Sequence, residues 1–333
     1  MIDVRWNEAV SSIAAALPRL TVALLIVSIA AGLRIPRKYF ELVSHFRVQY
    51  LVASTAFLLI SFAEANWWCA AGALLAAVIN ASRIVPYYAA KLPVGDPTIS
   101  EQRLRLVLVN VYQFNRSHGR FMSFLNRHQP DVVVVQELTE DWARALEGIT
   151  QHYPFFEVLP RPEGSGIALY SRFRFERWAP PLLEEHERPS ILVQLDVGNP
   201  KVTLLAIHPR APIRRGHFEL RNKLLASAGV CLNSLLGPKI CVGDLNTSVF
   251  SAYYQDFLRQ TELKDVRKGF GLLPSWPTYM VFAWLMIPID HCLVSRDIGV
   301  RNVQTGERIG SDHFPLIVEL DVPTTSPARP VSN

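Results

Sequence analysis

Two short segments near the C-terminus each combine an acid with a histidine directly after apolar residues. They are IDHCL, which contains Asp290, and GSDHFP, which contains Asp312 and His313. An imidazole that a carboxylate orients can take a proton from water, and this is the chemistry that a hydrolase needs. A two-residue Asp-His match is frequent by chance, so the interpretation depends on the residues that accompany it.

Three further apolar runs end on polar residues that could take part in the same chemistry. The polar residues are Glu137 in VVVVQEL, His208 in LLAIHPRAP, and Asp244 with Asn246 in ICVGDLN. Apolar, β-branched runs of this length are typical of buried strands. We therefore expect each of these polar side chains to lie at the tip of a strand.

Taken in order, the motifs resemble those of the endonuclease/exonuclease/phosphatase superfamily, which includes DNase I. The matching residues are Asn110, Glu137, His208, Gly243 to Asn246, Asp290 and Ser311 to His313. The GDLN and SDH elements are the specific ones, and the resemblance covers roughly residues 103–322. The chain is most similar to the bacterial membrane-anchored branch. The resemblance implies an α/β fold, a two-sheet αββα sandwich of the DNase I-like kind, and a metal-dependent hydrolase that acts on phosphoric ester bonds.

The oxygen-bearing side chains suit a hard divalent cation. Mg²⁺ takes oxygen ligands and needs only one or two carboxylates from a protein. We expect Glu137 to bind Mg²⁺, with help from Asn110 and Asp312, and Mn²⁺ is the alternative ion. Such a cation neutralises the phosphate oxygens and the leaving oxygen of a phosphodiester. The alternative for Glu137 is a solvated carboxylate at a strand end.

The remaining polar residues receive catalytic roles. We expect His313 to be the general base, because a histidine titrates near neutral pH. The resemblance implies that Asp290 orients His313, and that Asp244 and Asn246 position the attacking water and contact the phosphate. It also implies that His208 either donates a hydrogen bond to the phosphate or protonates the leaving group.

Two features after the strand motifs bear on the substrate. Arg210, with Arg214 and Arg215, forms the local basic cluster after His208, and we expect it to bind substrate phosphate unless it is merely solvated. Residues 274–288 are apolar and aromatic. We interpret this segment as a core strand, and the alternative is an exposed lip that touches lipid or an apolar substrate group.

The first ninety residues are a different kind of sequence, and we expect a transmembrane region there. About three helices are predicted, at 14–33, 48–65 and 67–88, each near the ~20 apolar residues that a bilayer requires. One alternative is a buried helical hairpin of a soluble protein. A cleaved signal peptide before a small helical domain is disfavoured, because no small-residue cleavage site is followed by polar sequence.

The rest of the chain divides by composition. Residues 91–102 read as a linker with Pro, Gly and Asp, residues 103–322 as the catalytic domain, and residues 323–333 as a disordered tail. Strand signals lie at 104–112, 132–136, 166–171, 191–197, 202–207, 240–243, 289–295 and 316–320. Helix signals lie at 118–128 and 219–235.

Charge does not identify the substrate. Residues 1–99 hold eight of the 34 Lys and Arg and five of the 29 Asp and Glu, which leaves 26 cations against 24 acids elsewhere. The catalytic part is therefore nearly neutral, and the overall basicity is no argument for a DNA groove.

We expect a membrane-anchored, Mg²⁺-dependent phosphodiesterase of the endonuclease type, which acts on nucleic acid. One alternative is a phosphodiesterase or phosphatase that acts on a phospholipid head group. A catalytically silent binding module is a further alternative, which the presence of every candidate site residue disfavours. The expected location is the bacterial inner membrane. The positive-inside rule places the catalytic domain in the cytoplasm, with the periplasm as the alternative, and the sequence indicates a lipid bilayer but no protein partner.

Overall fold

The computed structural model describes residues 2–33, 35, 38–90, 100–197 and 199–324, with the backbone alone for residues 2–14 and 100–101. Residues 91–99 of the expected linker and 325–333 of the expected tail lie outside the described residues. The chain divides into two units. One is Met1–Ala89 with Val249–Ala252, and the other is Ala90–Ser248 with Tyr253–Asn333.

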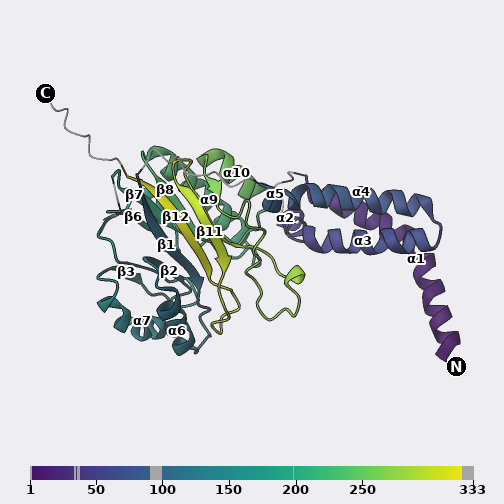
Figure 1. Cartoon of the computed structure of the whole chain (residues 1–333), viewed down its shortest axis with the longest axis horizontal. Helices are drawn as coiled ribbons and strands as arrows, with labels where there is room; N and C mark the ends of the chain where they lie inside the picture. The colour runs from purple at the N-terminus through teal and green to yellow at the C-terminus, as the bar shows by residue number, and fades with distance from the viewer. Residues whose placement is uncertain (1, 34, 36–37, 91–99, 198, 325–333) are drawn as a thin grey trace. The chain divides into compact units, whose positions relative to one another are not determined.

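The larger unit is built on two mixed sheets (Figure 1). The first has the order β11-β12-β1-β2-β4-β3, in which β1 and β2 are parallel neighbours and the other pairs are antiparallel. Its strands are β1 (Ser100–Asn110), β2 (Val132–Gln136), β3 (Phe155–Leu159), β4 (Ile167–Ser171), β11 (Gly299–Thr305) and β12 (Leu316–Thr324).

The second sheet has the order β5-β6-β7-β8-β10-β9 and again contains a single parallel pair, β7 with β8, within the described residues. Its strands are β5 (Phe175–Trp178), β6 (Ile191–Leu195), β7 (Val202–Ala206), β8 (Lys239–Asp244), β9 (Lys264–Asp265) and β10 (Asp290–Val294). Each sheet therefore presents the carboxyl ends of two neighbouring parallel strands at one edge.

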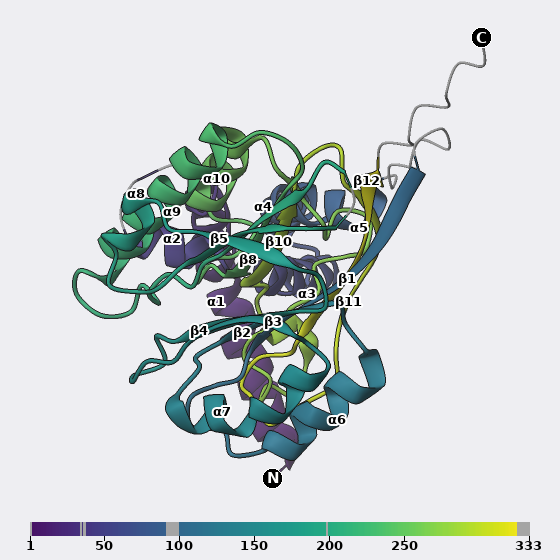
Figure 2. The ribbon, with the colours of Figure 1, turned by 90° about the vertical axis from the view of Figure 1, so that its left-hand side faces the viewer.

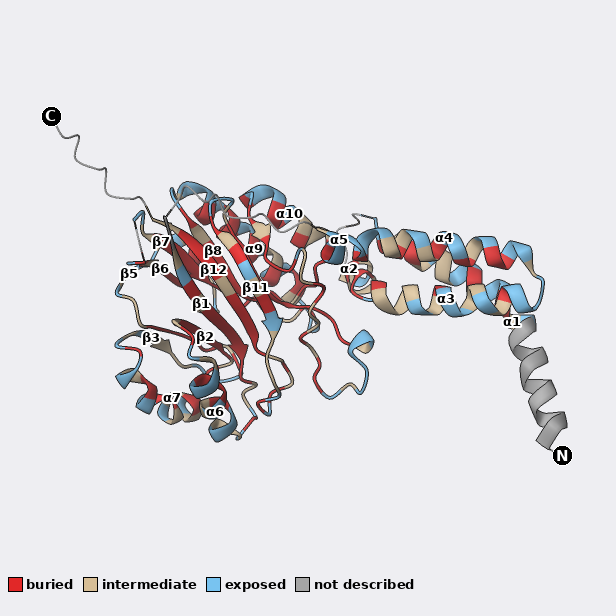
Figure 3. Cartoon of the chain, viewed as in Figure 1, coloured by how far each residue is buried: buried red, intermediate tan, exposed pale blue. Residues whose placement is uncertain are grey.

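Alternation of side chains along β1 explains how the layers assemble. Successive residues of a strand point to opposite faces. Leu106 and Leu108 belong to the core between the two sheets, together with residues such as Val193 from the second sheet. Val107 and Val109 point the other way and pack with residues of the outer helices. Both faces of the central strands are thus covered, and Figure 3 shows them as buried.

Helices cover the outer faces of both sheets. Figure 2 shows α6 and α7 outside the first sheet, and α9 and α10 outside the second. The helices of this unit are α6 (His118–His128), α7 (Glu140–Ala145), α8 (Pro181–Glu184), α9 (His217–Ser234) and α10 (Ala252–Thr261), with 3-10 turns at Glu147–Gln151 and Ala283–Leu285. The predicted two-sheet αββα sandwich is confirmed.

The smaller unit is helical. It contains α1 (Ile2–Ala30), α2 (Lys38–Ser44), α3 (Arg47–Ala63), α4 (Trp67–Ile84) and α5 (Pro86–Ala89). Among the described residues, one helical stretch, Trp67–Ala89, is long and apolar enough to cross a membrane, and α2 with α3 gives a second if that bent pair counts as one span. The apolar part of α1, Ala15–Ala30, is shorter than a span. The expectation of three spans remains a prediction.

Candidate active site

Strand ends from both sheets bring the predicted residues together. Asn110 is the last residue of β1, and Glu137 directly follows the parallel strand β2. Asp244 ends β8, and the antiparallel strand β10 starts opposite it, so that Asp290 is its register partner. His208 follows β7, the parallel neighbour of β8. Residues more than a hundred positions apart thus meet because of the strand order.

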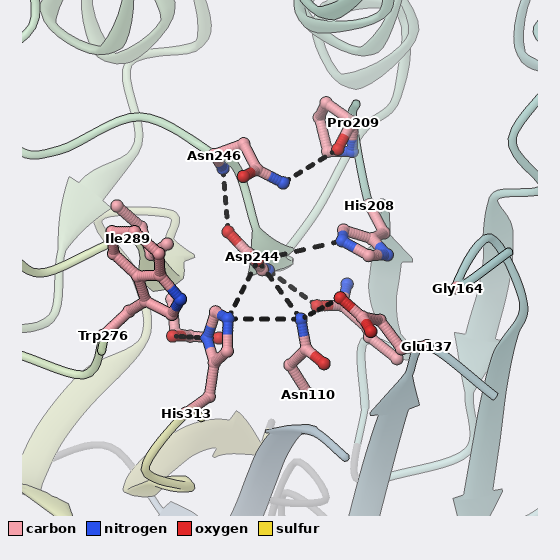
Figure 4. A network of polar contacts seen from close by, with 12 residues as sticks. Asn110, Glu137, Gly164, His208, Pro209, Asp244, Asn246, Trp276, Ile289 and His313 are labelled. Carbon is pink, nitrogen blue, oxygen red and sulfur yellow. Dashed lines mark hydrogen bonds and ion pairs between the residues drawn. The ribbon is translucent and has the colours of Figure 1, made fainter. Parts of the chain in front are cut away.

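Asp244 lies at the centre of the cluster (Figure 4). Its Oδ2 atom is 3.3 Å from Asn110 Nδ2, 3.7 Å from His208 Nε2 and 3.8 Å from His313 Nε2. Its Oδ1 atom accepts a hydrogen bond of 2.8 Å from the backbone N–H of Asn246. The carboxylate is therefore flanked by two imidazoles and held by an amide on each side.

His313 and Asp290 form a buried pair. His313 Nδ1 and Asp290 Oδ2 are 2.8 Å apart, and both side chains are almost fully buried. Burial lowers the pKa of His313, but the charge and hydrogen bond of Asp290, followed by the charges of Asp244 and Asp312, outweigh it and raise the pKa to about 10. Burial likewise raises the pKa of Asp290, but His313 and a bond from Ser275 bring it below its usual value.

The other imidazole has the opposite electrostatic environment. The pKa of His208 lies well below its usual value, because the ring is buried and because Arg188 and then His313 add positive charge. Arg188 Nη1 approaches His208 Nδ1 at 2.9 Å. Asp244 has a pKa raised to about 7, mainly by burial and by Asp290, against the lowering effect of His313. At neutral pH the two imidazoles therefore differ in charge.

Glu137 is held by its neighbours in a demanding conformation. Its φ of 59° lies in the left-handed region, which a residue with a side chain seldom adopts. One carboxylate oxygen accepts from Asn110 Nδ2 at 3.1 Å, and the other accepts from the backbone N–H of Gln113 at 3.0 Å. A Cβ at Gly164 would crowd this carboxylate, so the loop that covers Glu137 needs a glycine there.

Several carboxylates could serve a metal ion. Asp244, Asp290 and His313 each offer a ligand atom within 4.8 Å of the others, although His313 and Asp290 are already joined to each other. Asp312 accepts from Trp276 Nε1 with one oxygen, while its buried Oδ1 has no hydrogen-bond partner within the described residues. A buried carboxylate oxygen left without a donor is what an oxygen-seeking cation requires. The residues present fit such an ion.

The side chains of two other predicted site residues bond to partners outside the central cluster. Asn246 also has a positive φ, 51°, and its side-chain amide donates to the carbonyl of Pro209 at 3.0 Å. Arg210 forms a salt bridge with Glu187, with Nη2 and Oε2 2.5 Å apart. The guanidinium of Arg210 is thus occupied by a surface carboxylate.

Two positioning residues were missed in the sequence. Gln136 is fully buried. It donates to the carbonyl of Ile207 and accepts from the backbone N–H of Asp244, both at 2.8 Å, and so connects the two sheets beneath the site. The second is Arg188, which precedes β6. Gln136 sits beside Glu137 in a motif and could have been noticed, but Arg188 belongs to no motif and only the fold reveals it.

The aromatic segment 274–288 is not a core strand, so that interpretation is wrong. Apart from one bridge between Trp276 and Ile287 and a 3-10 turn, the segment is irregular. Four of its side chains are between 40% and 86% exposed: Tyr279, Val281, Phe282 and Trp284. Apolar character alone does not distinguish a buried strand from an exposed loop. The base of this loop is fixed by the bond from Trp276 to Asp312 and by Thr278, which bonds the backbone of Asp312.

A two-sheet sandwich with carboxylates, imidazoles and an amide at its joined strand ends defines a hydrolase of phosphoric esters of the DNase I-like class. Residues 107–313 match the model of the endonuclease/exonuclease/phosphatase family, and because this is more than half of the chain, the chain belongs to that family. Enzymes of this family depend on divalent metal ions. The resemblance to its membrane-anchored branch remains a prediction.

Solved structures share the fold at low sequence identity. TDP2 of D. rerio, complexed with a single strand DNA product, has 15% identity and a TM-score of 0.54 and covers 66% of this chain and 99% of its own. The 3′ phosphatase NExo from Neisseria, bound to a product DNA hairpin, has 19% identity and a TM-score of 0.53 over 65% of this chain and 98% of its own.

A Bacteroides vulgatus protein of the same family has 16% identity and a TM-score of 0.53, over 66% of this chain and 99% of its own. No curated protein sequence matches the chain. At these identities the likeness establishes the fold alone.

Proposed function

We propose that this chain is a membrane-anchored, Mg²⁺-dependent phosphodiesterase that acts on nucleic acid. The observation that carries the proposal is the convergence of Asn110, His208 and His313 on Asp244, with Glu137 joined to the cluster through Asn110. A binding module without catalysis gains nothing from five buried or half-buried polar groups whose charges oppose one another. A site that polarises a phosphate and deprotonates water requires them.

In this proposal Glu137 and Asp312 hold the metal, because each offers a carboxylate oxygen and Asp312 Oδ1 lacks a partner among the described residues. Mg²⁺, when bound, supplies positive charge for the phosphate and the leaving oxygen. Asn110 donates to Glu137 and Asp244, and its own oxygen accepts from the backbone N–H of Tyr112. Its amide thus orients both carboxylates, whether or not its oxygen also reaches the ion.

The proton from the attacking water goes to the unit formed by Asp290, His313 and Asp244. With a pKa of about 10, His313 is already protonated at neutral pH, whereas Asp244 has a pKa of about 7 and can accept. We therefore assign the first acceptance to Asp244. The His313 imidazolium, which Asp290 holds in place, then faces the phosphate as a cation. The alternative, with His313 itself as the base, is tested by a pH profile described below.

His208 acts in this scheme as a neutral hydrogen-bond donor. Because its pKa is lowered, the ring is neutral at neutral pH. It keeps one N–H group that can donate a hydrogen bond, but it has no acidic proton to transfer to a leaving group. Of its two expected roles, donation to a phosphate oxygen therefore fits better than protonation of the leaving group. Asn246, whose backbone N–H holds Asp244, positions that carboxylate from the other side.

Phospholipid head groups are the second candidate substrate. The specific observation in their favour is the exposed apolar loop with Phe282 and Trp284, whose base is bonded to Asp312 next to His313. Exposed aromatic groups of this kind are suited to a lipid interface. Nucleic acid remains the first candidate, because two structures with this fold hold DNA.

One assay separates these substrates. The purified full chain in detergent is incubated with Mg²⁺ and either supercoiled plasmid DNA or vesicles of phosphatidylcholine and phosphatidylglycerol, and Glu137→Gln serves as the matched inactive control. Nicking of plasmid by the wild type alone supports the proposal. Release of phosphorylated head groups alone transfers the function to lipid, and no product from either substrate favours the silent binding module.

A further inference from the structure

Arg188 is a largely enclosed cation without a carboxylate partner. It lies in the connection between α8 and β6, and its Nη1 atom donates to the carbonyl of Gly164 at 3.2 Å and to His208 Nδ1 at 2.9 Å. Within the described part of the chain, no carboxylate comes within ion-pair distance of its guanidinium, and its buried Nε has no hydrogen-bond partner. A guanidinium in this position normally meets an anion.

The guanidinium of Arg188 lies against the ring of His208. Its Nη1 atom is 2.9 Å from Nδ1 and 3.3 Å from Nε2, so it approaches both ring nitrogens at once. The Nε2 atom of the same ring also faces Asp244, at 3.7 Å. The pair of Arg188 and His208 therefore borders the centre of the site.

We infer that Arg188 is the cation that binds the substrate phosphate, beside His208, which contacts the same phosphate. This inference rests on the proposed function, since it names a further residue of that site. It moves to Arg188 the phosphate-binding role that we expected for Arg210.

A comparison of the two arginines supports the reassignment. Arg210 is paired with Glu187 through both Nε and Nη2, so an incoming phosphate would have to displace a carboxylate. Arg188 has no such competitor among the described residues, and its Nη2 makes no hydrogen bond there, so this atom is the donor available to a phosphate. Burial and the charge of Arg210 lower the pKa of Arg188, while Glu137 and Asp244 are close enough to raise it. The guanidinium therefore lies near both carboxylates and is bound to neither.

The first test measures binding without turnover. Inorganic phosphate is titrated calorimetrically into the full chain in detergent with Mg²⁺ present, for wild type, Arg188→Met, Arg188→Lys, Arg210→Met and the control Arg177→Met. A charge-assisted bond of this kind predicts about tenfold or greater weakening in Arg188→Met. We expect partial recovery in Arg188→Lys and wild-type affinity in Arg177→Met, a surface arginine that faces Glu157.

Unchanged affinity in Arg188→Met, or a larger loss in Arg210→Met, overturns the inference, as does a wild type that binds no phosphate. Thermal unfolding of each variant identifies any that fails to fold, and Arg188→Lys then decides the question. If no phosphodiester is hydrolysed by the wild type, the proposed function fails, but this titration still tests Arg188.

The second test asks whether Arg188 acts together with His208. With bis(p-nitrophenyl) phosphate as substrate, Arg188→Met, His208→Gln and the double variant form a cycle. We expect the combined loss of kcat/KM to be well below the product of the single losses, because both residues hold one phosphate. Guanidinium chloride should restore part of the lost activity of Arg188→Ala. It should not raise the activity of the control Arg177→Ala. Independent losses without rescue assign Arg188 a merely structural role and overturn the inference.

Discussion

Asp244 lies between two imidazoles whose pKa values are shifted in opposite directions, although burial lowers the pKa of both. On His313 the carboxylate of Asp290 outweighs burial and stabilises the charged ring. On His208 burial has the largest effect, and the guanidinium of Arg188 adds to it. Identical side chains thus become a cation and a neutral donor, because neighbouring charge and hydrogen bonding determine a pKa more strongly than residue type.

The metal assignment predicts the effect of neutralising Glu137. Glu137→Gln keeps the size of the side chain and removes one negative charge at the end of β2, so the fold should survive while ion binding weakens. We expect kcat/KM at limiting Mg²⁺ to fall by about a hundredfold or more, since a lost metal contact removes several kcal/mol from the transition state. Turnover equal to wild type across a Mg²⁺ titration would contradict the assignment.

The Asp290–His313 pair predicts unequal losses in two variants. His313→Ala removes the imidazole and should lower kcat by roughly two to four powers of ten, and Asp290→Asn should cost less because the ring remains. The measurement is steady-state turnover at saturating substrate, with His291→Gln as a control. His291 is a neighbouring buried histidine that bonds to the Thr247 carbonyl. Wild-type turnover in His313→Ala from pH 6 to 9 would exclude a role for it.

The pH dependence decides which group accepts the proton. Asp244 acts when ionised, so kcat/KM should rise with pH through a midpoint near 7, the raised pKa of this carboxyl, and a bound cation moves that midpoint lower. If His313 were the base, activity would instead rise toward pH 10, where that imidazolium loses its proton. A profile that is flat below pH 8 and climbs only above pH 9 would support the latter.

The sequence could supply the identities of most of these residues, because Asp244, Asn246 and His313 stand in short motifs after apolar runs. It could not supply their charges. The pKa of His208 depends on burial and then on Arg188, twenty positions earlier and outside any motif, and that of Asp244 depends on burial and then on Asp290 across a strand pair. Such couplings arise only when the sheets form.

At the scale of elements, the site follows from where strands end. The predicted ranges of β2, β4, β7 and β8 agree with the structure to within about a residue, because buried apolar runs bounded by polar residues leave a clear pattern. Strands β3, β5, β9 and β11 were not predicted. Strands β3, β5 and β11 are themselves partly exposed and have no continuous buried run, and β9 has only two residues, so strand pairing and not sequence pattern defines them. Strand order, which brings β8 to β10, also has no local signature.

Gln136 joins the two sheets, which leads to a prediction about both stability and activity. Gln136→Met fills the same space but leaves the buried N–H of Asp244 and the carbonyl of Ile207 without their side-chain partner. Each such group costs about 1–3 kcal/mol, so the melting temperature should drop by several degrees and activity should fall with it. Gln304→Met, at an exposed position of β11, is the control. Equal melting temperatures for the two variants would show that the sheets are joined by packing alone.

At the scale of the whole molecule, polar contacts show how the helices of the smaller unit run. Arg47, at the start of α3, donates to the carbonyl of Ser28 near the end of α1 and to Asn80 near the end of α4, at 2.8 and 3.1 Å. These three ends lie together, so α1, α3 and α4 alternate in direction. A buried arginine among apolar helices needs such partners. We propose that all three helices cross the membrane and place the two ends of the unit on opposite sides.

The cations between the helices predict the side of the membrane on which the catalytic domain lies. Arg34, Arg37 and Lys38 stand between the first two predicted spans, whereas the turn between α3 and α4 carries Glu64. Arg47 is buried in the helical unit and does not count as a loop charge, but three cations remain, and the positive-inside rule predicts that this loop is cytoplasmic. With three crossings the catalytic domain shares the side of this loop.

A fluorescent protein that matures only in the cytoplasm, fused after Asn333, should be bright, and an alkaline phosphatase fusion at the same residue should be inactive. The reverse pair of results would place the catalytic domain in the periplasm, through either an even number of crossings or three crossings in the inverted orientation.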